Sequence, residues 1–226
     1  MVRPVGRDMT TVGFIGSGKI GGTVARLAVA AGYDVVLSNS RGPETLADLV
    51  ADLGPKARAA TPAEAAQAGD LVVLSVPLHA YRVVPAAAVA GKPVLDTNNY
   101  YPQRDGRIAE LDAGSTTSSA LLQEHLAGDA AVVKVFNNIN WTQLGSLARP
   151  SGAADRSALP VAADDARAKE AVVAFLDAIG YDAVDTGSLA DSWRQQPDTP
   201  VYGVPYAGGP APAEKIRDAL AEAGRG

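Results

Sequence analysis

The chain has 226 residues, of which 47% are hydrophobic and 20% are charged, and its formal net charge is −5. This length and balance exclude a disordered or fibrous chain and indicate a soluble globular protein with one large domain. Cysteine is absent, which excludes disulfide bonds, thiolate metal sites and a cysteine nucleophile.

The charges and apolar runs argue against two classes of partner. Acidic residues outnumber basic ones by 25 to 20, and the basic residues are scattered singly, so a nucleic-acid surface is not expected. No apolar run approaches the ~20 residues of a membrane helix, and residues 1–10 lack the apolar segment of a secretory signal. We therefore expect a cytoplasmic protein with a small-molecule substrate, without a membrane or nucleic-acid partner and without a metal site.

Strand-like and helix-like segments alternate along residues 11–136. Continuous apolar runs are typical of parallel strands buried on both faces, and apolar residues spaced three and four apart indicate helices. In chain order the segments are a strand at 11–15, a helix at 20–31, a strand at 33–38, a helix at 43–54, a short strand at 57–60, a helix from 61, a strand at 70–77, a helix at 83–90, a strand at 93–96, a helix at 121–126 and a strand at 131–136. These six strands predict a doubly wound, mostly parallel α/β sheet of the Rossmann type.

The remaining sequence predicts a short βαβ extension of this sheet. Residues 159–163 and 183–184 are strand-like and flank an amphipathic helix at 164–179. The expected division of the chain is a loose tail at 1–10, a Rossmann domain at 11–196, and a C-terminal arm with a short helix at 197–226.

The arm is expected to be irregular because residues 197–212 contain five Pro and three Gly. It also carries Tyr202, Val204 and Tyr206, which would form an apolar patch if the arm were exposed. Since such patches usually mark interfaces, we expect the arm to pack across a second subunit of a homodimer.

A GxGxxG motif directly follows the first predicted strand and begins the first predicted helix, which is the context of a dinucleotide-binding loop. Gly16 permits the tight turn, Gly18 lets the backbone approach a pyrophosphate, and Gly21 lets the helix pack closely on the strand. The free N–H groups at the start of the helix favour phosphate binding. The residues of the motif are Gly16, Ser17, Gly18, Lys19, Ile20 and Gly21.

The end of the second strand predicts which nicotinamide cofactor binds. NAD-binding proteins usually place an acidic residue here to bind the ribose 2′-hydroxyl. This chain instead has Asn39, Ser40 and Arg41, whose hydroxyl, amide and guanidinium groups can donate to a 2′-phosphate. The sequence therefore predicts NADP(H), with a solvent-exposed Arg41 as the alternative.

Polar residues follow three further strands whose carboxyl ends should meet at one edge of the sheet. They are Ser75–Val76–Pro77, Asp96–Thr97–Asn98–Asn99 and Phe136–Asn137–Asn138. Ligands bind at this edge in doubly wound folds, so we expect Ser75, Val76, Pro77, Asn98, Asn99 and Asn137 to contact the cofactor. The alternative for the asparagines is turn formation through bonds to their own backbone.

Candidates for acid–base chemistry are few. The chain has two histidines and no Tyr-x-x-x-Lys sequence. His79 follows Pro77 closely enough to be a weak candidate on the substrate side, with a helix-start residue as the alternative. A carbonyl reductase needs a proton donor, so this scarcity favours an acceptor that takes a hydride unaided.

The glycine motif, the segment at 38–41, Ser75–Val76–Pro77 and the segment at 96–99 resemble the family of NADP-dependent deazaflavin (coenzyme F420) oxidoreductases. The resemblance extends over about residues 11–195. It implies a compact Rossmann protein, usually dimeric, that passes a hydride between NADPH and C5 of a deazaflavin co-substrate. It also implies that Ser17 binds phosphate, that Ser40 and Arg41 hold the 2′-phosphate, and that Val76 and Pro77 flank the nicotinamide.

Two other functions remain open at this point. One is an NADPH-dependent reductase of a flavin, quinone or small carbonyl compound, and the other is a non-catalytic NADP(H)-sensing protein. A planar acceptor would use aromatic residues after residue 99, although any one of them could serve the core instead. These candidates are Tyr100, Tyr101, Phe136, Trp141, Trp193, Tyr202 and Tyr206.

Overall fold

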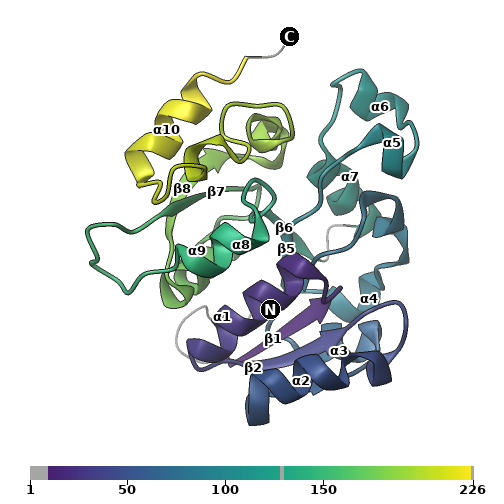
Figure 1. The fold of residues 1–226 in the computed structure, drawn as a ribbon. Coiled ribbons are helices and arrows are strands. Elements are labelled where there is room, and N and C mark those ends of the chain that lie inside the picture. The colour runs from purple at the N-terminus through teal and green to yellow at the C-terminus, as the bar shows by residue number, and fades with distance from the viewer. Residues whose placement is uncertain (1–9, 128–129, 225–226) are drawn as a thin grey trace.

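The computed structural model describes residues 10–127 and 130–224. These residues form an eight-stranded sheet with helices on both faces (Figure 1). The predicted tail at 1–10 lies outside the described residues except for Thr10. The strands are β1 (Thr11–Ile15), β2 (Asp34–Ser38), β3 (Ala57–Ala59), β4 (Leu71–Leu74), β5 (Pro93–Asp96), β6 (Ala131–Lys134), β7 (Ala158–Ala163) and β8 (Asp182–Gly187).

The order of the strands confirms the predicted doubly wound fold. The order is β3-β2-β1-β4-β5-β6-β7-β8, with β1 to β6 parallel, β7 antiparallel to β6, and β8 parallel to β7. The chain runs outward from β1 to β3 and then returns to place β4 on the other side of β1. Phe14 of β1 therefore pairs with Leu37 of β2 on one side and Val73 of β4 on the other. This reversal is the position at which doubly wound folds bind ligands.

The helices agree with the sequence prediction in most places. They are α1 (Lys19–Ala30), α2 (Ala47–Leu53), α3 (Pro62–Ala68), α4 (Ala86–Val89), α5 (Pro102–Asp105), α6 (Ala109–Asp112), α7 (Ser118–His125), α8 (Trp141–Ser146), α9 (Ala166–Ile179) and α10 (Ala213–Ala221). Thr61 caps α3 and forms a capping box with Glu64. Within the described part of the chain, no helix has the length and apolar character needed to cross a bilayer.

The prediction of a continuous helix at 83–90 is wrong. A 3₁₀-helix at Leu78–Val83 is followed by an extended Pro85 and then by the single turn of α4. Proline removes a backbone donor and clashes with the preceding turn, so a helix cannot run through Pro85. The helices α5, α6 and α8 were not predicted, and each spans at most six residues.

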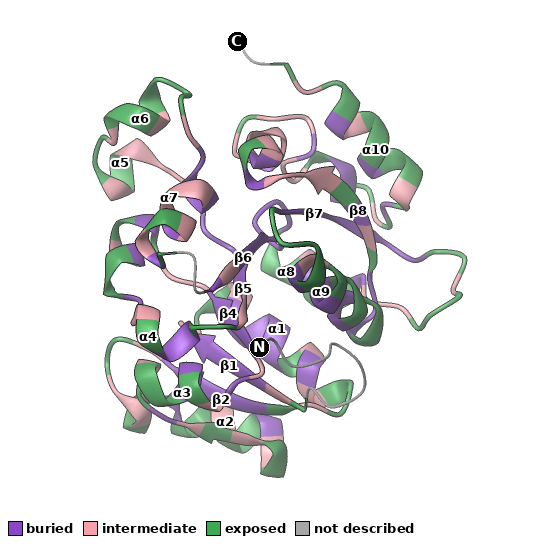
Figure 2. Ribbon diagram, turned by 180° about the vertical axis from the view of Figure 1, so that it is seen from behind, coloured by how far each residue is buried: buried purple, intermediate pink, exposed green. Residues whose placement is uncertain are grey.

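Two hydrophobic clusters lie on opposite faces of the sheet. Figure 2 shows that most of the central strands between them are buried. Neighbouring residues of β4 alternate between them, with Val73 in the cluster under α1 and α9 and Val72 in the cluster under α4 and α7. This alternation follows from the two-residue repeat of a strand. Both faces are therefore covered, as a parallel sheet requires, and the loops at the strand ends are left to form the site.

The expectation that the arm packs across a second subunit rather than on its own chain is wrong for most of the arm. Tyr206 is 1% exposed, and its hydroxyl donates to the carbonyl oxygen of Ala158 at 2.9 Å. The Asn138 side chain donates to the carbonyl oxygen of Val201 at 3.1 Å. Among the arm residues that the structure describes, 197–224, only Val204, at 67% exposure, is a large exposed apolar side chain. The sequence pattern could not distinguish packing on the same chain from packing on another.

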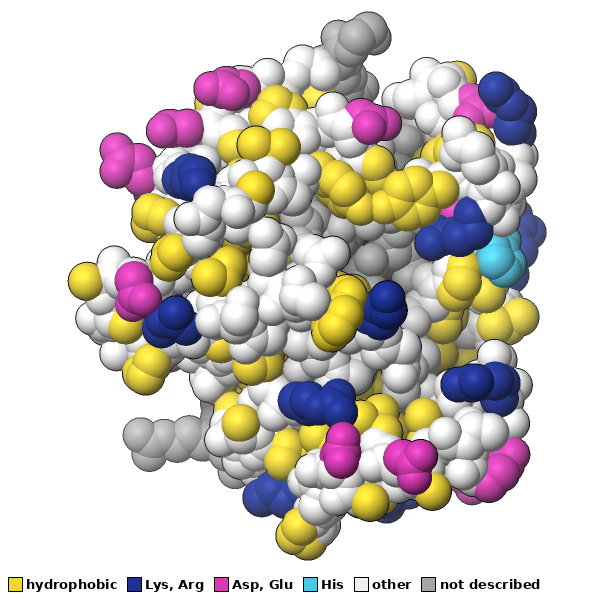
Figure 3. Space-filling model, in the orientation of Figure 1, with side chains coloured by type: hydrophobic (Ala, Val, Ile, Leu, Met, Phe, Trp, Pro, Cys, Tyr) yellow, Lys and Arg dark blue, Asp and Glu magenta, His cyan; other side chains and the backbone are white. Residues whose placement is uncertain are grey.

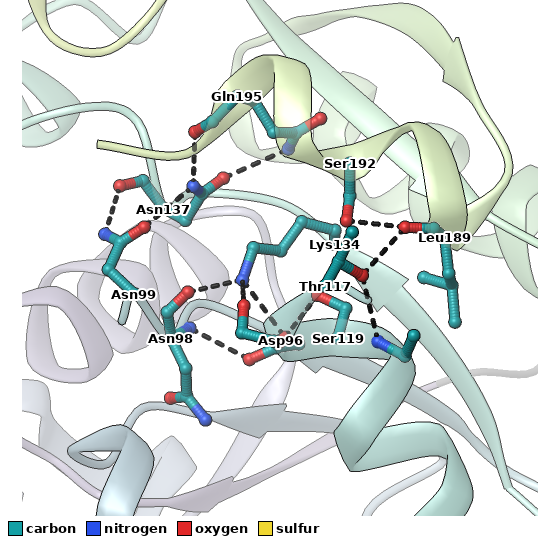
Figure 4. Close-up of polar contacts among 12 residues, drawn as sticks. Asp96, Asn98, Asn99, Thr117, Ser119, Lys134, Asn137, Leu189, Ser192 and Gln195 are labelled. Atoms are coloured by element: carbon teal, nitrogen blue, oxygen red, sulfur yellow. Dashed lines mark hydrogen bonds and ion pairs between the residues drawn. The ribbon is translucent and has the colours of Figure 1, made fainter. Parts of the chain in front are cut away.

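A buried ion pair joins the ends of β5 and β6. Lys134 Nζ lies 3.2 Å from Asp96 Oδ2, and both side chains are fully buried. The lysine also donates to the backbone carbonyl of Asn98 and to Ser118, while the Ser119 hydroxyl donates to Asp96 at 2.6 Å (Figure 4). Burial lowers the pKa of Lys134, and the Asp96 carboxylate opposes that shift. The cluster provides partners for both charges in a fully buried position, as buried charges require.

Replacing Lys134 should therefore destabilise the protein strongly. In Lys134→Met the Asp96 carboxylate stays buried without its cation, and we expect the free energy of unfolding to fall by about 3 kcal/mol. Urea denaturation measures this change. The double variant Lys134→Met with Asp96→Asn should regain part of the loss because the uncompensated charge is removed. A single variant within about 0.5 kcal/mol of the wild type would contradict this role.

Candidate functional site

A cavity of about 550 Å³ opens at the carboxyl ends of β1, β4, β5 and β6. Figure 3 shows a hollow near the centre of this face, bordered by hydrophobic and basic side chains. Its volume lies within the range typical of small-molecule sites. The lining residues are Gly18, Lys19, Ile20, Ser75, Val76, Pro77, Thr97, Asn98, Asn99, Tyr101, Arg104, Phe136, Asn137, Asn138, Ile139, Asn140, Trp141, Tyr202 and Gly203.

The three glycines of the loop after β1 have different surroundings. A Cβ on Gly16 would lie 2.1 Å from the Ser75 carbonyl oxygen, and its φ of +96° is itself unfavourable for other residues. A Cβ on Gly21 would lie 2.2 Å from the Gly16 carbonyl oxygen. Packing within the chain therefore requires both of these glycines. A Cβ on Gly18, in contrast, would have no heavy atom within 4 Å apart from those of its chain neighbours, so Gly18 borders open space at the cavity.

The helix that follows the loop presents its N-terminal end to the same cavity. Gly18 is the N-cap of α1, no side chain caps this end, and the first turn contains no acidic residue. Its first backbone N–H groups therefore lack partners within the helix, and the positive end of the helix dipole lies here. The Ser17 hydroxyl donates to the Ser38 carbonyl oxygen at 2.9 Å and does not line the cavity.

The segment after β2 forms a tight turn beside the loop. Asn39 Oδ1 accepts from the backbone N–H groups of Arg41 at 2.9 Å and Gly42 at 3.0 Å, so its side chain shapes the turn. Ser40 and Arg41 are exposed and lie outside the cavity lining. Among the residues that the structure describes, none accepts a hydrogen bond from the guanidinium of Arg41.

The asparagines after β5 and β6 fall into two groups. Asn99 and Asn137 bond to each other, with Asn137 Nδ2 donating to Asn99 Oδ1 at 3.0 Å and Asn99 Nδ2 donating to the Asn137 carbonyl oxygen at 2.7 Å. They tie the two strand ends together. The Asn98 side chain is different, because it is 3% exposed and neither its Nδ2 nor its Oδ1 has a partner within the described chain. Figure 4 shows this amide directed away from the Lys134 cluster.

An orphaned amide of this kind points to a ligand. Buried polar groups are nearly always hydrogen-bonded, and one without a partner costs free energy. The backbone of Asn98 is fixed, because its N–H donates to Asp96 Oδ1 at 2.9 Å and its carbonyl accepts from Lys134. The side chain therefore offers one donor and one acceptor to whatever enters the cavity.

The cavity lining includes four of the aromatic candidates, among them Phe136, and also Arg104, which the sequence reasoning did not name. Tyr101 and Arg104 come from the segment after β5, Trp141 begins α8, and Tyr202 comes from the arm. The hydroxyls of Tyr101 and Tyr202 are hydrogen-bonded to each other. The sequence reasoning found few candidate proton donors, and in the structure these two hydroxyls border the cavity. Of the aromatic candidates, Tyr100, Trp193 and Tyr206 lie outside the lining.

His79 lies outside the cavity lining, in the first turn of the 3₁₀-helix at Leu78–Val83. Its Nδ1 is 3.1 Å from Asp105 Oδ1. Burial raises the pKa of Asp105, but hydrogen bonds from Arg104, from the Tyr101 backbone and from His79 outweigh it and lower that pKa to about 2. These contacts support the helix-start alternative for His79. Among the described residues, there is no group of three His, Asp or Glu side chains that could together hold a metal ion.

The sequence and fold match known proteins. Residues 11–100 match the family described as NADP oxidoreductase coenzyme F420-dependent. The metalloreductase STEAP3 of Rattus norvegicus is 27% identical over 190 residues, which cover 83% of this chain and 36% of that protein. The chain spans well under half the length of the curated relatives it matches.

Two solved structures share most of the fold. Protein SMa0349 of Sinorhizobium meliloti, whose function is hypothetical, has a TM-score of 0.70 and 29% identity, and the match covers 92% of this chain and 95% of that one. A protein of Arthrobacter sp. FB24, with a suggested identity as an F420-dependent NADP-reductase, has a TM-score of 0.68 and 24% identity. That match covers 82% of this chain and 87% of the other.

These matches confirm the Rossmann-type reductase fold and the family resemblance stated from the sequence. The matched segment includes the glycine loop, the turn after β2 and the strand ends of β4 and β5. The likeness to the family described as NADP oxidoreductase coenzyme F420-dependent therefore lies in residues 11–100.

Proposed function

We propose that the protein is an oxidoreductase that transfers a hydride between NADP(H) and a deazaflavin acceptor of the coenzyme F420 type. The observation that supports the binding of a dinucleotide cofactor is the open space at Gly18. Two glycines of the loop are required by packing within the chain, whereas the third leaves room at an uncapped helix N-terminus beside a cavity. This arrangement suits a pyrophosphate, because backbone N–H groups and the helix dipole both favour an anion there.

NADP(H) is proposed over NAD(H) because of the turn after β2. Arg41 is exposed, its guanidinium has no acceptor among the described residues, and none of the three residues directly after the strand, 39–41, is acidic. Ser40 adds a hydroxyl beside it. A guanidinium binds phosphate through charge-assisted hydrogen bonds, so this turn would hold the 2′-phosphate.

The nicotinamide half would lie against the ends of β4 and β5. Val76 and Pro77 give this side of the cavity an apolar wall, and Asn98 supplies the unpaired amide. When bound, a reduced nicotinamide supplies the hydride. The protein's own contribution is to orient the ring and to limit water around it.

The deazaflavin is proposed as the acceptor because the matched family is described by its dependence on coenzyme F420. A second candidate is a quinone or small carbonyl compound. The specific observation that favours it is the presence of the Tyr101 and Tyr202 hydroxyls in the cavity lining, because a carbonyl reductase uses such a donor.

The protein should bind NADPH at least tenfold more tightly than NADH. A hydrogen bond to a charged phosphate contributes ~1.5–3 kcal/mol, which corresponds to about 10- to 150-fold in affinity. Calorimetric titration with each cofactor measures the ratio. Arg41→Ala should bring the two affinities together by weakening NADPH alone, and equal affinities in the wild type would refute NADP selectivity.

Gly18→Ala should weaken NADPH binding at least tenfold without unfolding the protein. The added Cβ would occupy the open space beside the loop, and the fold loses no contact there, so the free energy of unfolding should change by less than about 1 kcal/mol. Gly22→Ala is the matched control, since a Cβ there makes ordinary contacts at 3.6 Å or more and lies outside the cavity lining. Unchanged NADPH affinity in Gly18→Ala would contradict the proposed position of the pyrophosphate.

A panel of acceptors tests the hydride transfer itself. With protein and NADPH, a deazaflavin should accelerate the loss of nicotinamide absorbance more than a flavin, a quinone or a small ketone. His79→Ala should keep this rate within about tenfold of the wild type, because positioned acid–base catalysis is worth 10² to 10⁴ and His79 lies outside the lining. Acceleration by a quinone or ketone alone would favour the second candidate, and no acceleration by any acceptor would favour a sensing protein.

A further inference from the structure

The hydroxyls of Tyr101 and Tyr202 form a pair on the cavity wall that no part of the cofactor proposal uses. Both residues line the cavity, although they are separated by 101 positions in the chain. Tyr101 follows β5, whereas Tyr202 belongs to the arm. The arm is held in place here because the Gly203 N–H donates to the Asn138 carbonyl oxygen at 2.8 Å. The pair is therefore a product of the folded arm.

One of the two hydroxyl protons of the pair has no hydrogen-bond acceptor among the described residues. Whichever hydroxyl donates within the pair, the other keeps its own proton, and no described protein group accepts it. The neighbouring amide does not change this count, since Asn99 Nδ2 is a donor and lies 3.4 Å from the Tyr202 oxygen. Burial raises the pKa of Tyr202, as do the hydrogen bond and charge interaction with Tyr101, so the hydroxyl stays protonated at neutral pH. One O–H donor is thus left at the cavity wall.

The charges around the pair indicate that the missing acceptor is uncharged. The Arg104 guanidinium lies 4.9 Å from the ring centre of Tyr101, but its Nη2 is 2.8 Å from Asp105 Oδ2. The arginine is therefore already neutralised by a carboxylate. The negative charge of Asp198 also raises the pKa of Tyr202. The described cation in contact with the pair is thus already paired, whereas a carbonyl oxygen needs only the donor.

We propose that the Tyr101–Tyr202 hydroxyl pair binds a carbonyl oxygen of the hydride acceptor. The pair and the Asn98 amide border the same cavity from different segments, so an acceptor with a ring carbonyl could be held at this edge while its reactive carbon faces the nicotinamide. A deazaflavin carries such carbonyls on its pyrimidinedione ring, and a quinone carries them opposite each other. This inference rests on the proposed function, because it assigns a binding group for the acceptor of that reaction.

The test measures binding of 5-deazariboflavin and menadione to the protein saturated with NADP⁺, by fluorescence quenching or calorimetry. The double variant Tyr101→Phe with Tyr202→Phe removes both hydroxyls and keeps both rings. It should weaken whichever compound binds by about tenfold, the loss typical of one hydrogen bond in this setting. Affinity for NADPH should stay within about twofold of the wild type. The C=O stretching frequency of the bound compound, measured by Raman difference spectroscopy, should rise in the double variant because the hydrogen bond is lost.

Tyr100→Phe is the matched control. The Tyr100 hydroxyl donates to Asp112 at 2.8 Å and lies outside the cavity lining, so this variant should leave acceptor affinity and the carbonyl frequency unchanged. Equal affinity and equal frequency in the wild type and the double variant would overturn the inference. It is also overturned if the wild type binds NADPH but neither compound, and the cofactor half of the proposed function then stands. Failure of the wild type to bind NADPH would refute the proposed function first, and the inference with it.

Discussion

The buried ion pair between Lys134 and Asp96 is the constraint on which the cavity wall depends. Two charges without water must satisfy each other and their remaining hydrogen-bonding capacity, because the cost of leaving either unpaired is several kcal/mol. Ser118, Ser119 and the Asn98 backbone provide the remaining partners. The strand ends of β5 and β6 are therefore held at a fixed separation, and the backbone of Asn98 is held with them.

The loops that follow β5 and β6 are held in place because these strand ends are fixed. Asn99 and Asn137 bond across the gap between them, and Asn137 Nδ2 also donates to the Gln195 carbonyl oxygen at 2.6 Å (Figure 4). The segment before the arm is thus bonded to the loop that follows β6. Asn138 extends the connection to the arm itself through Val201. A cavity whose wall comes from distant parts of the chain can present preorganised groups, which lowers the cost of ordering them when a ligand binds.

The glycine loop and the sheet could be predicted from sequence because their signals are local. The order strand, glycine motif and helix lies within residues 11–30, and continuous apolar runs such as Leu71–Leu74 mark strands buried on both faces. The apolar spacing at 83–90 is helical, but no continuous helix forms there because Pro85 lacks the backbone N–H that a helix interior needs.

The rest of the site could not be predicted because it depends on contacts between distant residues. Tyr202 reaches Tyr101 only after the arm has folded back onto its own chain, and nothing near either residue indicates the other. The same applies to the packing of Tyr206 against Ala158. Asn98 was predicted as a cofactor residue from its place after β5, but its unpaired amide became apparent only from the packing around it. Local patterns located the edge of the sheet, and tertiary contacts determined which groups face the cavity.

The most direct test of the central claim is a crystal structure of the protein with NADP⁺ bound. The account predicts the pyrophosphate over Gly18 at the start of α1, the 2′-phosphate at Ser40 and Arg41, and the nicotinamide in the cavity beside Val76 and Pro77 with a hydrogen bond to the Asn98 amide. An NADP⁺ bound at any other surface, with the Asn98 amide still without a partner, would contradict it.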